Sequence, residues 1–426
     1  MAENPRIVGA IVGALRFRNA APENLRSLSD LEWHELIEYA DLSHLTLPLG
    51  VNCRSYLPEW VGARIDENLR DNCKRWELIK ASYEEVRSAF ISSDVQHVVL
   101  KGFAQCPDYA PSPNARFQSD IDLYCPDASM RHAVEALRQL EYEPVAISRN
   151  PDHLPVMIRR GDWNWRGNSY DPEMPPSIEL HHLFWNRERM RLGPSDLKQF
   201  WSRRTGRSID NLVFPALNLV DNLGFSALQV LRDLLNGALS AHKVYELAYF
   251  LHHKANDHIF WRAWGLTHDP DLRSCEAVSF CLAETCFHCN VAPQVAEQIA
   301  NLPRTIRAWM PKYGQGSLTT HRTSEKDGLW VHLALVDSVR DKWAVLLRTF
   351  LRTPDPQRML AESASVQGGG RWMQYAFYGL KRVPRHAWSI PRMLYHGGRI
   401  LVASRRVGRN EASAGQDAEL DLERTA

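Results

Sequence analysis

Residues 98–125 read VVLKGFAQCPDYAPSPNARFQSDIDLYC, and this stretch decides the fold. An apolar run at 98–100 ends on Lys101-Gly102, and a second apolar run contains Asp120 and Asp122, one residue apart. Because side chains alternate along a strand, both aspartates project from the same face. Two like charges held side by side repel each other, and a cation between them relieves the repulsion. The pattern predicts a strand whose carboxylate pair suits Mg²⁺, which proteins commonly hold with one or two carboxylates plus substrate phosphates.

Composition excludes several classes of protein. The chain has 426 residues, of which 44% are hydrophobic and 24% charged, enough for two or three domains with sizeable cores. A net charge of +1 gives no reason to expect a nucleic-acid partner. The apolar residues near the N-terminus are followed at once by Arg16 and Arg18, which favours an amphipathic helix over a signal segment. Eight scattered cysteines fit reduced thiols and a cytoplasmic location.

Local patterns divide the chain into five parts and predict an α+β fold. Residues 1–93 are predicted to be helical, with Ser29 or Asp30 capping one helix and Pro58 opening the next. The α+β core covers 94–190, a helical region 191–350, a basic helical segment 351–407 and a disordered tail 408–426. Within the core, the predicted strands are 95–100, 117–125, 144–148, 154–160 and 177–184, with a helix at 127–140.

The letters LKG at 100–102, a loop containing Tyr109 and RFQSDIDL at 116–123 resemble a known motif. It belongs to the uncharacterised nucleotidyltransferase family, whose members carry LKG followed by R-x-x-S-D-I-D-L. That family is part of the DNA polymerase β-type nucleotidyltransferase superfamily. The resemblance covers roughly residues 25–260 and is strongest at 98–125. It implies a small mixed-sheet nucleotidyltransferase core flanked by helical regions.

A third carboxylate is expected at 177–181, SIELH, which resembles the acid-Leu-His strand of the family. Glu179 and His181 are two residues apart and share one strand face. If that face adjoins Asp120 and Asp122, the three carboxylates would act as catalytic ligands of two Mg²⁺ ions. Two blander interpretations stay open: Glu179 paired with an arginine, and His181 as a hydrogen-bonded structural group.

The same resemblance implies a nucleotide-binding group made of Lys101, Gly102, Arg116, Ser119 and His181. Gly102 lacks a Cβ where the backbone approaches phosphate, and Lys101 and Arg116 are the nearest cations for a triphosphate. Two alternatives remain: Lys101 organises the carboxylates, or Arg116 anchors the proline-containing loop.

The resemblance implies a Mg²⁺-dependent enzyme that moves a nucleoside monophosphate from an NTP such as ATP to an acceptor, releasing pyrophosphate. The acceptor would be a hydroxyl-type group on a small molecule, glycan or peptide, as in natural-product or polysaccharide biosynthesis. The alternative is a non-catalytic protein of the same fold that binds nucleotide or a partner. Phe103 favours that alternative, because a phosphate-binding Ser or second Gly often stands there.

Two further segments invite interpretation. Cys286-x-x-Cys289 superficially suggests zinc, but its apolar neighbours and the lack of a second ligand pair favour a buried helix. Residues 381–409 interleave basic with apolar side chains, which is typical either of peripheral contact with an anionic membrane or of a docked terminal helix. The basic residues are Lys381, Arg382, Arg385, Arg392, Arg399, Arg405, Arg406 and Arg409.

Overall fold

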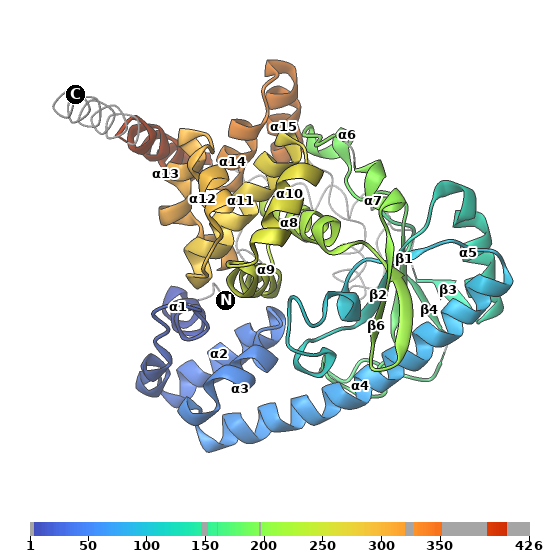
Figure 1. Ribbon diagram of the computed structural model, residues 1–426. Helices are drawn as coiled ribbons and strands as arrows, with labels where there is room; N and C mark the ends of the chain where they lie inside the picture. Colours follow the sequence, from blue (N-terminus) through green and yellow to red (C-terminus); the bar gives the residue numbers. More distant parts are fainter. Residues whose placement is uncertain are drawn as a thin grey trace, which may run out of the picture.

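The structure is a computed structural model that describes residues 4–145, 152–159, 161–195, 197–319, 327–351 and 390–406. The predicted tail at 408–426 and residues 352–389 and 407 of the predicted basic helical segment lie outside the described residues. The chain is mostly helical around one central sheet, as Figure 1 shows. The predicted α+β class with flanking helical regions is therefore confirmed, while the five-part division stays a prediction.

The helices are α1 (Pro5–Ala14), α2 (Asp30–Leu42), α3 (Thr46–Cys53), α4 (Glu59–Ser92), α5 (Asp127–Gln139), α6 (Arg187–Met190), α7 (Lys198–Ser202), α8 (Leu219–Asn236), α9 (Ala241–Lys254), α10 (His258–Thr267), α11 (Pro270–Phe287), α12 (Pro293–Ala300), α13 (Arg304–Tyr313), α14 (Gly328–Leu335) and α15 (Val339–Leu351). Residues 390–406 are also helical. The strands are β1 (Val98–Val99), β2 (Asp120–Tyr124), β3 (Tyr142–Pro144), β4 (Met157–Arg159), β5 (Ser177–His181), β6 (Thr205–Ile209) and β7 (Leu212–Ala216).

Capping fixes the predicted helix starts in the N-terminal region. The Ser29 hydroxyl accepts a hydrogen bond from the Glu32 N–H, and the Glu32 carboxylate accepts one from the Ser29 N–H, a reciprocal capping box. Pro58 precedes α4 as predicted. This helix runs from the N-terminal helices along the sheet (Figure 1), so it ties the two regions together.

The sheet has seven strands in the order β3-β4-β5-β2-β1-β7-β6. It is mixed, because β2 pairs parallel with β5 and antiparallel with β1, while β1 pairs parallel with β7. The sequence predicted helices throughout 191–350, and this is wrong for residues 205–216, which form the β6–β7 hairpin. Buried Leu212, Phe214 and Ala216 alternate with partly or fully exposed residues, a strand pattern too short and too polar to stand out.

The two faces of the sheet differ in chemistry. On one face, the apolar strand residues Ile121, Leu123, Ile178 and Leu180 share a core with residues of α4 and α5, which include Tyr83 and Phe90 of α4. On the other face, the alternate residues of β2 and β5 are polar or charged. A long apolar helix, α8, and its neighbour α9 lie opposite that polar face (Figure 1). The fold therefore supports the polar face from behind and encloses it from the front.

Helix α11 packs against α8 and α9 inside the largest core. Cys275, Cys281 and Cys286 lie on this helix and, with Cys289 just after it, are buried free thiols. The interpretation of this segment as a buried helix is confirmed. Among the described residues, the group of side chains arranged to hold a metal ion lies elsewhere, on the sheet.

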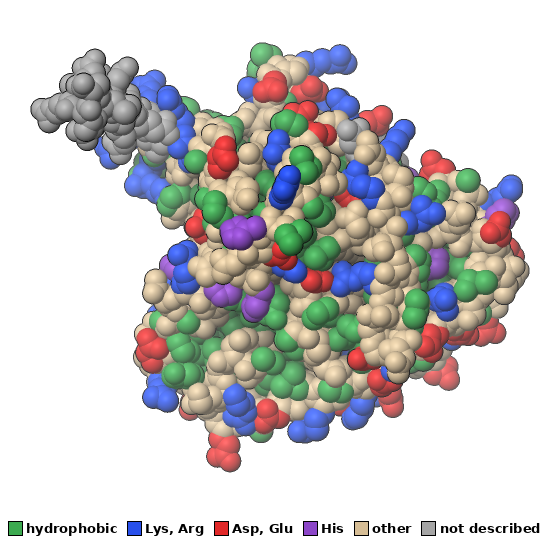
Figure 2. Space-filling view, viewed as in Figure 1, with side chains coloured by type: hydrophobic (Ala, Val, Ile, Leu, Met, Phe, Trp, Pro, Cys, Tyr) green, Lys and Arg blue, Asp and Glu red, His purple; other side chains and the backbone are tan. Residues whose placement is uncertain are grey.

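No helix in the described part of the chain is both long and apolar enough to cross a bilayer. In the view of Figure 2, acidic and basic side chains are interspersed over the body of the molecule. Basic side chains gather where the helix at 390–406 projects from it. This distribution agrees with the near-neutral net charge.

Candidate active site

Strand register brings the three predicted carboxylates together. In the parallel β2–β5 pair, Asp122 is registered with Glu179 and Asp120 with Ser177. Because side chains alternate along both strands, Asp120, Asp122, Glu179 and His181 project from one face. We call the three carboxylates, with Lys101 and His181, the carboxylate cluster.

Direct contacts in the carboxylate cluster centre on Asp122. The Lys101 Nζ donates to Asp122 Oδ1 at 2.6 Å, and His181 Nε2 lies 2.8 Å from the same oxygen. His181 Nε2 is also 3.5 Å from Glu179 Oε2. One potential ligand atom from each of Asp122, Glu179 and His181 lies within 4.8 Å of the others, a spacing that one cation can bridge.

These contacts stabilise the ionised form of two of the acids. Burial alone would raise the pKa of Asp122, but Lys101 and His181 outweigh burial and hold it well below its ordinary value. Burial would also raise the pKa of Glu179, but the hydrogen bond from His181 and the charges of Lys101 and His153 together lower it. His181 shows the reverse: burial would lower its pKa, and the hydrogen bonds to Asp122 and Glu179 raise it.

Asp120 is the exception in the cluster. Burial, and then the charges of Asp122 and Glu179, raise its pKa to about 7. Within the described ranges, no group donates a hydrogen bond to the Asp120 carboxylate, although its backbone carbonyl accepts one from Gln118. The repulsion among the three carboxylates therefore acts mainly on Asp120, because Asp122 and Glu179 are stabilised by direct partners.

The turn after β1 is closed by a residue that the sequence did not single out. Gly102 has φ +68°, and a Cβ there would lie 2.2 Å from Gln118 Nε2. Gln118 Oε1 accepts the Phe103 N–H at 3.0 Å, and its Nε2 donates to the Asp120 carbonyl at 2.7 Å. In this structure the glycine thus makes room for the Gln118 side chain, at the place where the sequence predicted phosphate.

Phe103 faces away from the site. Its ring is fully buried and lies 5.0–5.6 Å, centroid to centroid, from the rings of Trp76, Tyr83 and Phe214. The position lacks a hydroxyl for phosphate, as the sequence indicated. The ring fills the core behind the sheet and leaves the cavity in front of it open.

Arg116 is held by internal partners. Its guanidinium pairs with Glu246 of α9 at 2.9 Å and donates to Gln105 Oε1 at 3.0 Å and the Phe117 carbonyl at 3.3 Å. This arrangement fits the alternative that Arg116 anchors the loop before β2. Its predicted contact with nucleotide stays a prediction.

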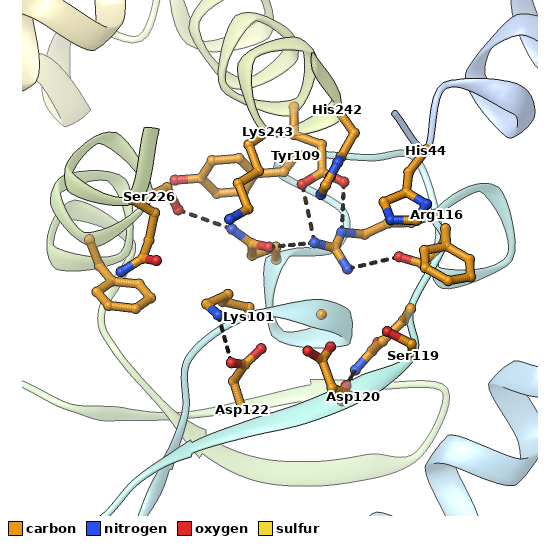
Figure 3. A pocket seen from close by; sticks show the side chains of 17 residues that line it. His44, Lys101, Tyr109, Arg116, Ser119, Asp120, Asp122, Ser226, His242 and Lys243 are labelled. Carbon is orange, nitrogen blue, oxygen red and sulfur yellow. Dashed lines mark hydrogen bonds and ion pairs between the residues drawn. The ribbon is translucent and has the colours of Figure 1, made fainter. Parts of the chain in front are cut away.

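A cavity of about 180 Å³ lies between the polar sheet face and α8–α9. Figure 3 shows Lys101, Asp120 and Asp122 on one side of it and His242 and Lys243 on the other. Six of the predicted site residues line it: Lys101, Gly102, Arg116, Ser119, Asp120 and Asp122. His181 contacts both Asp122 and Glu179 and so connects Glu179 to the residues that line the cavity.

The opposite wall was missed from the sequence. It includes Ser226 and Gln229 on α8 and His44 before α3. The signal was present at 219–236, where Ser226 and Gln229 stand three apart, on one helix face, in a mostly apolar run. Gln229 is 4% exposed, and its Oε1 has no hydrogen-bond partner among the described residues. The wall therefore offers an unused acceptor close to the carboxylates.

Comparison with known families gives one match. The model of the family described as uncharacterised nucleotidyltransferase matches residues 29–288, from the cap of α2 to the residue after α11. This range includes the whole sheet and both walls of the cavity. No curated protein matches the chain.

Proposed function

Because the chain belongs to the uncharacterised nucleotidyltransferase family, we propose that it moves a nucleoside monophosphate from an NTP to a hydroxyl-type acceptor and releases pyrophosphate. Family membership makes the protein a transferase with an NTP substrate. We propose in addition that the reaction depends on Mg²⁺, that ATP is a donor, and that the acceptor is a small molecule, glycan or peptide. A cytoplasmic role in natural-product or polysaccharide biosynthesis rests on family analogy alone.

The observation that carries the proposal is the Asp120 carboxylate, which lacks a direct partner in the carboxylate cluster. Lys101 and His181 contact Asp122, and His181 and His153 contact Glu179, whereas the Asp120 carboxylate receives no hydrogen bond from the described residues. Oxygen ligands with an unpaired negative charge suit Mg²⁺. The residues present therefore fit the metal that the family implies.

Each residue has a proposed role. Asp120, Asp122 and Glu179 would hold the metal, and His181 orients the last two through its ring nitrogen. When bound, Mg²⁺ would lower the pKa of the acceptor hydroxyl and stabilise the leaving pyrophosphate. Lys101, Gly102, Arg116 and Ser119 line the nucleotide side of the cavity.

The wall across the cavity is proposed to position the acceptor. Ser226 Oγ already accepts a hydrogen bond from Gln105 Nε2 at 3.0 Å, whereas the Gln229 oxygen is available to a donor. A hydroxyl-bearing acceptor supplies such a donor. An acceptor held there would face Asp120, because both walls border the same cavity.

The direct test is labelling from α-³²P NTPs. Purified protein is incubated with Mg²⁺, each NTP in turn and a fractionated cell extract, and acquired label is located by chromatography. Asp120→Ala is the blank, and Asp108→Asn, whose partner is Arg207, is the matched acidic control. Label that appears with the wild type and the control, but not with the blank, supports the transferase. Nucleotide binding without transfer to any acceptor would favour the alternative, a non-catalytic nucleotide- or partner-binding protein.

The helix at 390–406 supports a second proposal, peripheral contact with an anionic membrane surface. It carries four arginines and no acidic residue, and Leu394, Tyr395 and Leu401 are each more than half exposed. Co-sedimentation with phosphatidylserine vesicles tests it, using the full chain and the variant Arg399→Glu/Arg405→Glu/Arg406→Glu. Binding that is lost in the variant supports the contact, and undiminished binding would remove it.

A further inference from the structure

Lys101 occupies the face of Asp122 that a metal ion would need. Its Nζ lies 2.6 Å from Asp122 Oδ1, at the oxygen that also contacts His181. Only 18% of the Lys101 side chain is exposed, and that of Asp122 is 3% exposed. An ion pair so shielded from water is screened little by salt, so Lys101 competes with a second cation for the charge of Asp122.

Gln118 blocks the neighbouring position in the same way. A phosphate at the turn would need backbone N–H donors, and Gln118 Oε1 takes the Phe103 N–H at 3.0 Å. The Gln118 side chain also stands in the space that Gly102 leaves. Without ligand, an internal ammonium thus fills the metal position and an internal carboxamide oxygen fills a phosphate position.

We propose that Lys101 is a positioning residue that closes Asp122 to free metal ions and releases it when a nucleotide phosphate attracts its ammonium group. The inference rests on the proposed function, since it concerns the same metal and nucleotide. It identifies the ligand of the site as the metal–nucleotide complex. Free divalent ions alone are poor ligands.

The reason lies in the exchange of partners. A metal ion arriving alone must break the Lys101–Asp122 pair and then lies next to a displaced, half-buried ammonium. A metal ion arriving with a triphosphate brings anionic oxygens that bind the ammonium group. Lys101 then exchanges Asp122 for phosphate, and Asp122 exchanges Lys101 for the metal ion. Lys101 borders the cavity in which the phosphates would bind, so its ammonium group is placed to meet them.

The experiment titrates Mn²⁺ into metal-free protein and follows the free ion by electron paramagnetic resonance. Wild type is compared with Lys101→Met, which keeps the length of the side chain without its charge. Lys243→Met is the matched control, because Lys243 borders the same cavity and makes an equally short ion pair, 2.6 Å, with Asp233 outside the cluster. Each protein is also titrated in the presence of a non-hydrolysable α,β-methylene ATP.

Lys101→Met is expected to bind free Mn²⁺ on the order of tenfold more tightly than wild type, while Lys243→Met matches wild type. Adding Asp122→Asn to Lys101→Met should abolish the gain. Equal affinity of wild type and Lys101→Met for free Mn²⁺ would overturn the inference, as would an equal gain in Lys243→Met. Circular dichroism confirms that each variant is folded, and Lys101→Gln, with the same expected gain, replaces Lys101→Met if that variant unfolds.

Failure of the proposed function would look different. In that case no protein in the set, wild type included, binds Mn²⁺ even with the ATP analogue. If the analogue supports binding in wild type and Lys101→Met gains nothing with the free ion, the transferase stands and the role of Lys101 falls. The two arms of the titration therefore separate the two ideas.

Discussion

Two buried clusters of acids and histidine in this protein differ in how their charges are balanced. The carboxylate cluster lies on β2 and β5, and the second cluster, which we call the His268 cluster, joins α8, α11 and the segments before them. Its members are His268, Glu276, Asp221 and Arg203. Both clusters bring a histidine between two acids, so the comparison isolates what else differs.

The His268 cluster is closed. Glu276 accepts hydrogen bonds from His268 Nδ1 and Trp264 Nε1, both at 2.8 Å, one on each oxygen. The oxygens of Asp221 accept from Arg203 at 2.6 and 2.9 Å, and His268 Nε2 lies 3.3 Å from one of them. Two acids face two cations, and each carboxylate oxygen has a donor.

In the carboxylate cluster, Asp122 and Glu179 have direct partners in Lys101, His181 and His153, whereas the third acid, Asp120, has none among the described residues and borders a cavity. A buried polar group without a partner costs free energy. A fold that gives every acid of one cluster a partner and leaves one acid of the other without a partner marks the second cluster as a place for a ligand. The difference teaches that the charge balance distinguishes a structural cluster from a binding site better than acid content does.

The largest expected effect is on the His268 cluster. His268→Leu removes the cation between Asp221 and Glu276 and should lower the free energy of unfolding by about 3–5 kcal/mol, because it leaves buried charge uncompensated. Denaturant unfolding at pH 7 measures it. His258→Ala, on the exposed start of α10, should stay within about 0.5 kcal/mol of wild type. A loss below about 1 kcal/mol in His268→Leu would break the comparison.

The pH dependence of the same cluster comes next. Burial alone would lower the pKa of His268, but Glu276 and Asp221 raise it to about 9. A raised histidine pKa contributes stability that is complete below its unfolded value, about 6.5, and is lost as pH rises through 9. Between pH 6.5 and 9, the free energy of unfolding of wild type should therefore fall by about 3 kcal/mol relative to that of His268→Leu. Parallel stability curves for the two proteins would contradict the assignment.

Neutralising Asp120 should change the free energy of unfolding in the opposite direction, towards higher stability. Its raised pKa means that the fold disfavours the ionised form, so Asp120→Asn should raise the free energy of unfolding of metal-free protein at pH 8 by on the order of 2 kcal/mol. The same variant should bind the Mn²⁺–nucleotide complex at least about tenfold more weakly. Thermal and denaturant unfolding, with and without Mn²⁺, measure both effects. A destabilised Asp120→Asn would show that the acid is structural.

The smallest effect is expected at Glu179. The lowered pKa of this residue indicates that the ionised form stabilises the fold, through His181. Glu179→Gln should therefore lower the free energy of unfolding of metal-free protein by about 1 kcal/mol, whereas Asp120→Asn should raise it. The pair of measurements sharpens the comparison by locating the excess charge on Asp120. Equal gains in both variants would show that the repulsion is shared.

The parts of the site that are local in sequence could be predicted. Strand alternation alone puts Asp120 and Asp122 on one face, and the parallel register of β5 then brings Glu179 beside Asp122. Capping at Ser29 was readable for the same reason, because its partner is three residues away. Short-range periodicity carries this information.

The rest depends on contacts between distant residues. Arg116 finds Glu246 130 residues later, and His268 finds Asp221 47 residues earlier, so neither pairing leaves a local signal. Strand β6 is the edge of the sheet and has no buried side chain, which weakens the periodicity of the β6–β7 hairpin. In the sequence, Gln118 is an ordinary polar residue. Only the structure shows that its side chain fills the space beside Gly102.

The central claim is that the carboxylate cluster binds an NTP through a divalent metal ion. Calorimetric titration of ATP, GTP, CTP and UTP into wild type and Asp122→Asn, each with Mg²⁺ and with EDTA, tests it most directly. The account predicts that at least one NTP binds wild type only with Mg²⁺, and binds Asp122→Asn about a hundredfold more weakly or not at all. Binding of no NTP to wild type, or equal binding to both proteins, would contradict it.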